Sequence, residues 1–285
     1  LLTDLFSKSN VAEVVSRLTS GGRGLRKEAR ELKTAIEAVL GEYHHERDPR
    51  MWQNAEEFLS LLDRAQTTTR LRSYFAALGG AGGGMDDAEV LKYRSAARAY
   101  LALACDHWMP DAGANLADDE RWRPFVRWKS TLLKPTDTII TFNYDRVIER
   151  LFGGNGIDVC SPNGTRLPDT QCVLKLHGCV SWSSGALDQA PDKYDDDCWA
   201  TALSTDRFFA LGIPGPSKLS ARGHFKGLWD QAKDAIQHAD AVVVVGYQFA
   251  ATDDEAKLEL LGALERNQNA KVAVWIVVGD PRNQR

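Results

Sequence analysis

Asn143, Asp145 and His177 follow two short apolar runs of the sequence, 137–141 and 173–176. Runs of this kind, bounded by polar residues and glycine, are typical of buried strands. An imidazole can accept a proton at neutral pH, because its ordinary pKa is about 6.5. An amide donates and accepts hydrogen bonds without carrying charge, which suits it to hold a water molecule or a sugar hydroxyl. These residue types could therefore direct a hydroxyl nucleophile at a reaction centre.

Each of these residues also has a structural explanation. Asn143 could cap the helix that begins after it, and Asp145 could be a first-turn carboxylate of the same helix. His177 could be a core histidine bonded to backbone. We favour a functional role for Asn143 and His177, because both stand at strand ends and the same plan recurs at a third place. For Asp145 the two explanations stay open.

The third strand end lies at Gly246, after a valine-rich run, and Thr252 and Asp253 follow it. In a parallel sheet the carboxyl ends of the strands open at one edge, where open α/β sheets bind their ligands. We therefore expect Asn143, His177 and Thr252 or Asp253 to face one pocket.

The elements that must position these residues alternate after residue 135. The expected strands are 137–142, 171–176, 240–246 and 271–278, and the expected helices between them are 144–152, 222–237 and 253–266. This alternation predicts an α/β fold, with a parallel sheet and helices on its faces. Before residue 130, apolar residues at helical spacing predict helices over 4–18, 25–46, 54–65 and 85–108.

Three blocks of the sequence resemble the bacterial branch of the sirtuin-like family. They are "TFNYD", "KLHGCVSW" and "ADAVVVVGYQFAATD", the last one after the helical "HFKGLWDQAKDAI". The resemblance runs from about residue 54 to residue 280. It implies a Rossmann-like, NAD-binding domain over 1–285, with a helical part over about 1–130 and a strand–helix part over about 135–285.

The resemblance also implies a set of site residues. The catalytic residues would be Asn143, His177 and Asp145, and the residues that bind NAD would be Thr141, Phe142, Gly178, Gly246, Thr252, Asp253 and Asp280. Gly246 would let the backbone approach the dinucleotide. Thr252 or Asp253 could bond a ribose hydroxyl, with a helix N-cap as the competing explanation for either.

The activity that the resemblance implies is hydrolysis of NAD to nicotinamide and ADP-ribose. Relatives of this type are often effectors of bacterial antiphage defence, so we expect a homo-oligomer and an activating protein partner. A non-catalytic sensor of NAD or an ADP-ribose derivative is the second hypothesis. An NAD-dependent protein deacylase is the third, and it is disfavoured because the five cysteines form no C-x-x-C pair for a zinc ribbon. We expect no zinc.

The composition limits which binding partners and which cellular compartment we expect. The formal net charge is -4, which gives no electrostatic footprint for direct binding of nucleic acid. No apolar stretch is long enough for a membrane span. We expect a cytoplasmic protein in which each cysteine is a small buried hydrophobe. The chain begins at Leu1 without a signal pattern, and by the resemblance we expect a glycine-rich phosphate turn upstream of it.

Four further stretches carry expectations of their own. We expect 181–216 to be irregular, as a lid over the pocket, and 79–84 to be a flexible glycine connection. The aromatic rings of Phe125 and Trp128, three residues apart on a helix, should pack in the core. The acidic run 195–197 lacks spaced partner ligands for a metal, so we expect a solvated turn.

Overall fold

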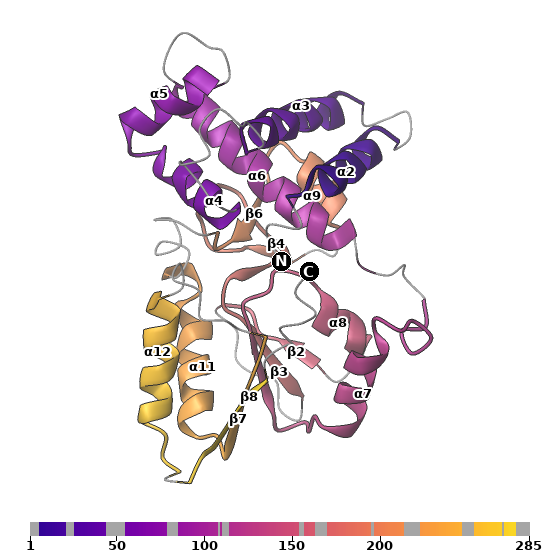
Figure 1. The fold of residues 1–285 in the computed structure, drawn as a ribbon, viewed down its shortest axis with the longest axis vertical. Helices are drawn as coiled ribbons and strands as arrows, with labels where there is room; N and C mark the ends of the chain where they lie inside the picture. Colours follow the sequence, from indigo (N-terminus) through magenta and orange to yellow (C-terminus); the bar gives the residue numbers. More distant parts are fainter. Residues whose placement is uncertain are drawn as a thin grey trace.

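The computed structural model describes most of the chain. The described residues are 6–20, 26–43, 55–78, 85–107, 109, 114–153, 157–162, 170–194, 197–213, 223–246, 254–269 and 271–277. Helices α2 to α6 gather at one end of the molecule, and the parallel strands with helices on both sides occupy the other end (Figure 1). The expected glycine connection 79–84 lies outside the described residues.

The helical part is built around one central helix. Its elements are α2 (Lys8–Ser20), α3 (Arg26–Tyr43), α4 (Ala55–Arg64), α5 (Thr69–Leu78) and α6 (Asp87–His107). The other helices pack around α6, directly or through a neighbour, and all residues of α6 from Ala96 to Cys105 are buried. Alanine recurs along this stretch, and its small side chain lets neighbouring helices approach closely on several sides. The four helices expected here are confirmed within a few residues, and α5 was not expected.

The parallel sheet has the order β1-β3-β2. Its strands are β1 (Thr138–Thr141), β2 (Ile157–Val159) and β3 (Gln171–Lys175), and every residue of β3 is buried. Helices α7 (Arg123–Thr131) and α8 (Val147–Phe152) lie on one side, and α11 (Lys226–Gln237) and α12 (Asp254–Glu265) on the other (Figure 1). Strands β7 (Ala241–Val245) and β8 (Ala273–Val277) pair with each other in parallel. The expected α/β, Rossmann-like architecture with a helical N-terminal part is confirmed.

An antiparallel sheet stands where we expected an irregular lid, so that expectation was wrong. The segment forms β4 (Gly178–Ser184), β5 (Lys193–Tyr194), α9 (Cys198–Leu203) and β6 (Phe208–Leu211), with strand order β5-β4-β6. We expected an irregular segment because it is rich in serine and other polar residues, but Ser183 and Ser184 are buried. Their hydroxyls are satisfied: Ser184 donates to the carbonyl of Ala186 at 2.7 Å, and Ser183 accepts from Arg207 at 3.0 Å. Buried hydroxyls are tolerated in a strand when they find such partners.

The β4–β6 sheet lies between two hydrophobic clusters. Val180, Phe209 and Leu211 pack with the helical part. Trp182 and Ala210 pack with the parallel sheet and α11. The antiparallel sheet is therefore the layer that joins the two ends of the molecule.

The aromatic residues of α7 do not pack as expected. Among the described residues of α7 none is buried, and Phe125 is 47% exposed. The buried ring is that of Trp122, one residue before the helix, which packs with Val147 and Leu151. The expectation that Phe125 lies in the core was wrong, because the helix begins at Arg123 and turns that side chain to solvent; Trp128 is half-buried.

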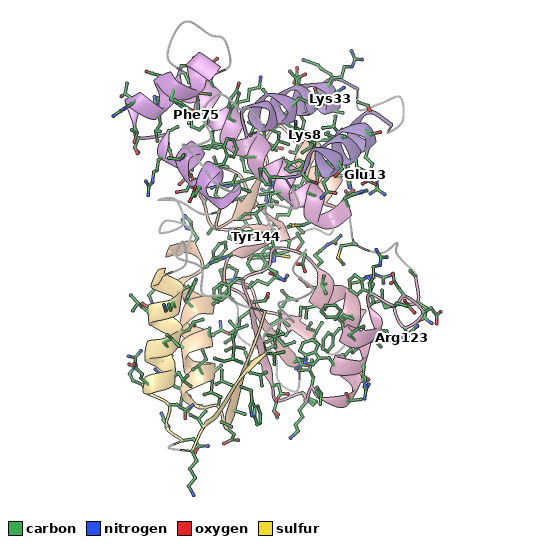
Figure 2. All side chains as sticks on the ribbon, viewed as in Figure 1. Lys8, Glu13, Lys33, Phe75, Arg123 and Tyr144 are labelled. Carbon is green, nitrogen blue, oxygen red and sulfur yellow. The ribbon has the colours of Figure 1, made fainter. Side chains whose placement is uncertain are left out.

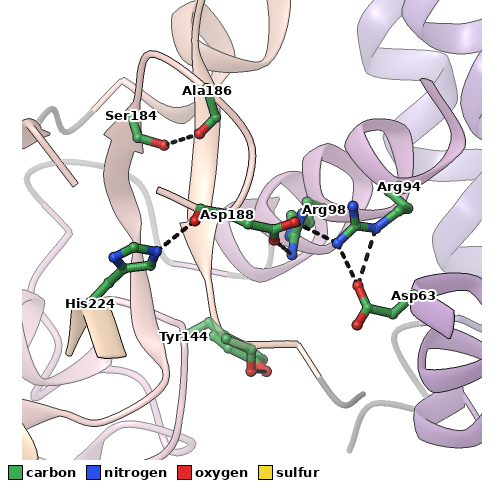
Figure 3. Close-up of polar contacts among 9 residues, drawn as sticks. Asp63, Arg94, Arg98, Tyr144, Ser184, Ala186, Asp188 and His224 are labelled. Atoms are coloured by element: carbon green, nitrogen blue, oxygen red, sulfur yellow. Dashed lines mark hydrogen bonds and ion pairs between the residues drawn. The ribbon is translucent and has the colours of Figure 1, made fainter. Parts of the chain in front are cut away.

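A buried group of charged residues also joins the two ends (Figure 3). We call Asp63, Arg94, Arg98 and Asp188 the arginine cluster. Arg94 of α6 donates to Asp63 of α4 and to Asp188, each at 2.6 Å, and Arg98 donates to the other oxygen of Asp188 at 2.6 Å. Asp188 lies in the turn between β4 and β5 with a left-handed φ of 61°. Its carbonyl oxygen is 2.6 Å from Nε2 of His224, just before α11.

None of the described helices has the length and apolar character needed to cross a membrane.

Candidate functional site

The carboxyl ends of β1 and β3 lie side by side. Thr141 pairs with Lys175 in the parallel register, and the backbone N–H of Leu176 donates to the carbonyl of Thr141 at 3.0 Å. The two chain segments that follow therefore leave the sheet at one edge. As a result, Phe142 and His177 meet, with their ring centroids 4.8 Å apart.

His177 is a buried imidazole among aromatic rings. Its side chain is 6% exposed, and besides Phe142 its ring lies 6.3 Å from that of Tyr144 and 6.4 Å from that of Trp229, centroid to centroid. The backbone carbonyl of His177 accepts a hydrogen bond from Gly212 at 2.8 Å. The imidazole of His177 is thus largely shielded from bulk water.

The aromatic residues are themselves fixed by hydrogen bonds. The hydroxyl of Tyr144 donates to the carbonyl of Gly212 at 3.0 Å, and Nε1 of Trp229 donates to the carbonyl of Leu176 at 3.2 Å. Tyr144 lies at the junction between the helical part and the strands (Figure 2). Trp229 of α11 and Tyr144, which packs in the hydrophobic cluster of the helical part, therefore both adjoin His177.

Asn143 follows β1 and is exposed. Its backbone N–H donates to Oγ1 of Thr141 at 3.1 Å, which fixes the turn as the chain leaves the strand. The side-chain oxygen at the start of α8 comes from Asp145 instead, since Oδ1 of Asp145 accepts from the N–H of Val147 at 2.9 Å. The N-cap residue of α8 is Arg146, which makes no side-chain capping bond. Asn143 therefore does not cap the helix, and its amide stands at the surface beside the segment of His177.

Asp145 is buried, 5% exposed, behind the turn that carries Asn143. Its bond to Val147 is that of a carboxylate stabilising a helix start. Asp145 lies two residues before α8, so it is not the first-turn carboxylate that the sequence allowed, and its structural part is the bond to Val147. A catalytic part for Asp145 stays a prediction.

Lys175 is a charged residue of the site that the sequence analysis missed. It is 0% exposed and is the last residue of β3, the central strand of the sheet. Its Nζ donates to the backbone carbonyl of Asp145 and lies 3.2 Å from Oε1 of Glu149 on α8. Cys179 donates its thiol to the same Oε1 at 3.5 Å. We call Lys175, Asp145, Glu149 and Cys179 the lysine cluster.

The electrostatics of the lysine cluster keep the lysine charged. Burial alone lowers the pKa of Lys175, but Cys179, Glu149 and Asp145 outweigh it and raise that pKa above its usual value. The signal in the sequence was the position itself, a lysine inside an apolar run. A buried ammonium needs charged or polar partners, so such a lysine predicts partners from elsewhere in the chain.

The two glycines of the predicted NAD site, Gly178 and Gly246, are explained by different features of the structure. Gly178 has a φ of 86°, and a Cβ there would lie 2.3 Å from the carbonyl oxygen of Ala210. The close approach of β6 therefore requires a glycine at this place. Gly246 directly follows β7, with a φ of 66° and open space around it, so only its backbone conformation favours glycine. Contact of either glycine with NAD stays a prediction.

The structure brings together part of the predicted site. Asn143, Asp145 and His177 lie on neighbouring segments at one sheet edge, with Thr141 and Phe142 beside them. The other predicted residues, Thr252, Asp253 and Asp280, lie outside the described residues. A cavity of about 360 Å³ lies elsewhere, between α3, α6, α9 and β6, and neither Asn143 nor His177 lines it.

Cysteines and acidic residues have structural roles in the described part of the chain. All five cysteines are buried thiols, as expected, and Cys179 in addition belongs to the lysine cluster. Burial raises the pKa of the Cys198 thiol to about 12. Asp197, from the acidic run, caps α9 by accepting the N–H of Ala200 at 2.9 Å. Over the described ranges, no group of three or more His, Cys, Asp or Glu residues could hold a metal ion.

Comparison with known proteins identifies the family. No curated protein matches the chain in sequence. The family model of the SIR2-like domain matches residues 137–285, the region that holds every described strand from β1 to β8 and the edge where Asn143 and His177 lie. Helices α2 to α7 precede the matched region. The chain therefore belongs to the SIR2-like family, whose domains act on NAD.

Proposed function

We propose that this protein is an NAD glycohydrolase that cleaves NAD to nicotinamide and ADP-ribose at the edge formed by Asn143 and His177. The observation that carries the proposal is the burial of His177 at the carboxyl end of β3, beside the turn after β1 that presents Asn143. In open α/β sheets this edge is where ligands bind.

Cleavage of the bond between nicotinamide and ribose needs little acid catalysis from the protein. Nicotinamide leaves as a neutral ring, since the positive charge that it carries in NAD is neutralised by the bonding electrons it takes. The ribose carbon passes through an oxocarbenium-like state, as in glycoside hydrolysis. Water supplies the oxygen that bonds to this carbon, and one proton is released.

Each side chain has one part in this step. The imidazole of His177 accepts the proton of the attacking water or of a ribose hydroxyl, a task that suits a group with an ordinary pKa near ~6.5. The amide of Asn143 holds the water or hydroxyl by hydrogen bonds without adding charge. Correct placement of the two groups accounts for much of the rate.

The surroundings of His177 fit the nicotinamide ring of intact NAD. The rings of Phe142, Tyr144 and Trp229 lie between 4.8 and 6.4 Å from the imidazole. Such rings exclude water, and their faces attract a flat cation such as the pyridinium of NAD. NAD enters here as the substrate.

We further propose that the activity is that of a regulated effector in bacterial antiphage defence, acting as a homo-oligomer with an activating protein partner. The three blocks that resemble the bacterial sirtuin-like branch support this role. It predicts that the release of nicotinamide depends on protein concentration or on the partner.

Nicotinamide release from NAD over a series of protein concentrations tests the activity. We expect His177→Ala to lower the release at least about 10²-fold, because a general base contributes on that order. The matched control is His238→Ala, the same substitution at an exposed imidazole after α11, and it should retain the wild-type rate. A His177→Ala protein with the wild-type rate would contradict the assignment. Tight binding of NAD without release at any concentration would favour the sensor hypothesis.

A further inference from the structure

The ammonium of Lys175 contacts the backbone of the segment that carries Asn143. We propose that Lys175 is a positioning residue, whose buried ammonium holds the backbone carbonyl of Asp145 and so fixes Asn143 relative to His177. The proposal rests on the function proposed above, because it concerns the same site.

The geometry places the ammonium at the turn between β1 and α8. Lys175 pairs with Thr141 in the sheet, and its Nζ reaches past that strand end to the carbonyl of Asp145. The preceding carbonyl, that of Tyr144, accepts the N–H of Val180 at 3.0 Å. Two successive carbonyls of the segment are thus held, one by β4 and one by Lys175.

An apolar side chain would fill the same place in the strand more simply. Every residue of β3 is buried, and taking an ammonium out of water is costly unless it is fully paired. Lysine supplies what an apolar residue lacks, a donor for a buried carbonyl that leaves the sheet ladder. This contact with the backbone, in addition to the ion pair with Glu149, argues for a positioning part.

The consequence is local to residues 142–147. His177 lies in the two-residue turn that joins β3 to β4, and its carbonyl is bonded by Gly212, whereas Asn143 is exposed and depends on the segment that carries it. Misplacement of a reacting group by about 1 Å can lower a rate about 10²-fold. Loss of the Lys175 contact should therefore impair turnover more than it impairs the fold.

Three variants separate positioning from charge balance. Lys175→Met removes the ammonium and leaves Glu149 without its ion pair, so its melting temperature should fall. Glu149→Gln removes the opposite charge. The double variant Lys175→Met/Glu149→Gln removes one positive and one negative charge, which restores the formal charge of the lysine cluster, and its melting temperature should recover most of the loss.

We expect the double variant to stay slow although it is stable. Its kcat for nicotinamide release should be about 10- to 100-fold below wild type, while KM changes little. Glu149→Gln, which keeps the lysine, should be less impaired. If the double variant regains both stability and turnover, Lys175 only balances the charge of Glu149 and the proposal is wrong.

Hydrogen exchange tests the same proposal without relying on activity. In the double variant, peptides that cover residues 142–147 should exchange about 10-fold faster or more than in wild type, while peptides of α6 remain unchanged. If wild type releases no nicotinamide at any protein concentration or with its activating partner, the proposed function fails, and the exchange rates still decide the part of Lys175. Unchanged exchange at 142–147 would overturn the proposal. So would a double variant that does not fold, since a positioning part predicts a folded protein.

Discussion

Two buried groups of charged residues differ in what they hold together. In the arginine cluster, side chains meet side chains, and Arg94 reaches Asp188 across 94 positions of the sequence. In the lysine cluster, an ammonium meets a backbone carbonyl 30 positions away within the same α/β layer. The first joins the helical part to the β4–β5 turn, and the second fixes one segment at the site edge. Buried charge can therefore serve the assembly of a molecule in one place and the local geometry of a site in another.

The largest effect that would test this comparison is on stability. Asp188→Asn keeps the size and tolerates the left-handed backbone, but it leaves Arg94 and Arg98 with the single carboxylate of Asp63 in the cluster. Breaking a buried ion pair by removal of one partner costs about 3 kcal/mol or more, so we expect a loss of that size in the free energy of unfolding, measured by denaturant titration.

The control for this prediction is an exposed ion pair. Asp119→Asn removes a carboxylate bonded to Arg121 at the surface, and it should change the denaturation midpoint little. Hydrogen exchange at residues 142–147 should remain as in wild type in folded Asp188→Asn. Faster exchange there would show that the two clusters are coupled, and the comparison would not hold.

A smaller effect on the free energy of unfolding should be seen at acidic pH. Burial raises the pKa of Asp188, but the charges of Arg98 and Arg94 and their hydrogen bonds outweigh it and lower that pKa below its usual value. A carboxylate of this kind stabilises the fold above the unfolded pKa of about 3.9, and its contribution is lost as the pH falls through the folded value. The stability difference between wild type and Asp188→Asn should therefore shrink below about pH 4. A difference that stays constant down to pH 2 would contradict the assigned ion pairs.

The sequence predicted the elements whose patterns are long and regular. Strands β1, β3, β7 and β8 and the helices between them lie within a few residues of the expected ranges, because apolar runs and helical spacing are local signals. The antiparallel sheet was missed, because its buried serines are made acceptable by distant partners. Arg207, for example, is 24 positions from Ser183, and no local pattern reports such a partner.

The sequence also predicted only some of the residues of the site. The rule that parallel strands open at one edge placed Asn143 and His177 on neighbouring segments, and the structure has them there. Lys175 was missed because its partners are far along the chain, and the sequence shows only an isolated lysine in an apolar run. The parts of Asn143, His177 and Gly246 in NAD cleavage remain predictions.

The most direct test of the proposed activity is the rate of NAD consumption by Asn143→Ala beside wild type. Because this side chain is exposed, the substitution should change the free energy of unfolding by no more than about 0.5 kcal/mol, and equal melting temperatures would verify that both proteins are folded. We expect consumption to fall about 10²-fold, since the amide positions the attacking hydroxyl. An Asn143→Ala protein that consumes NAD at the wild-type rate would contradict the mechanism.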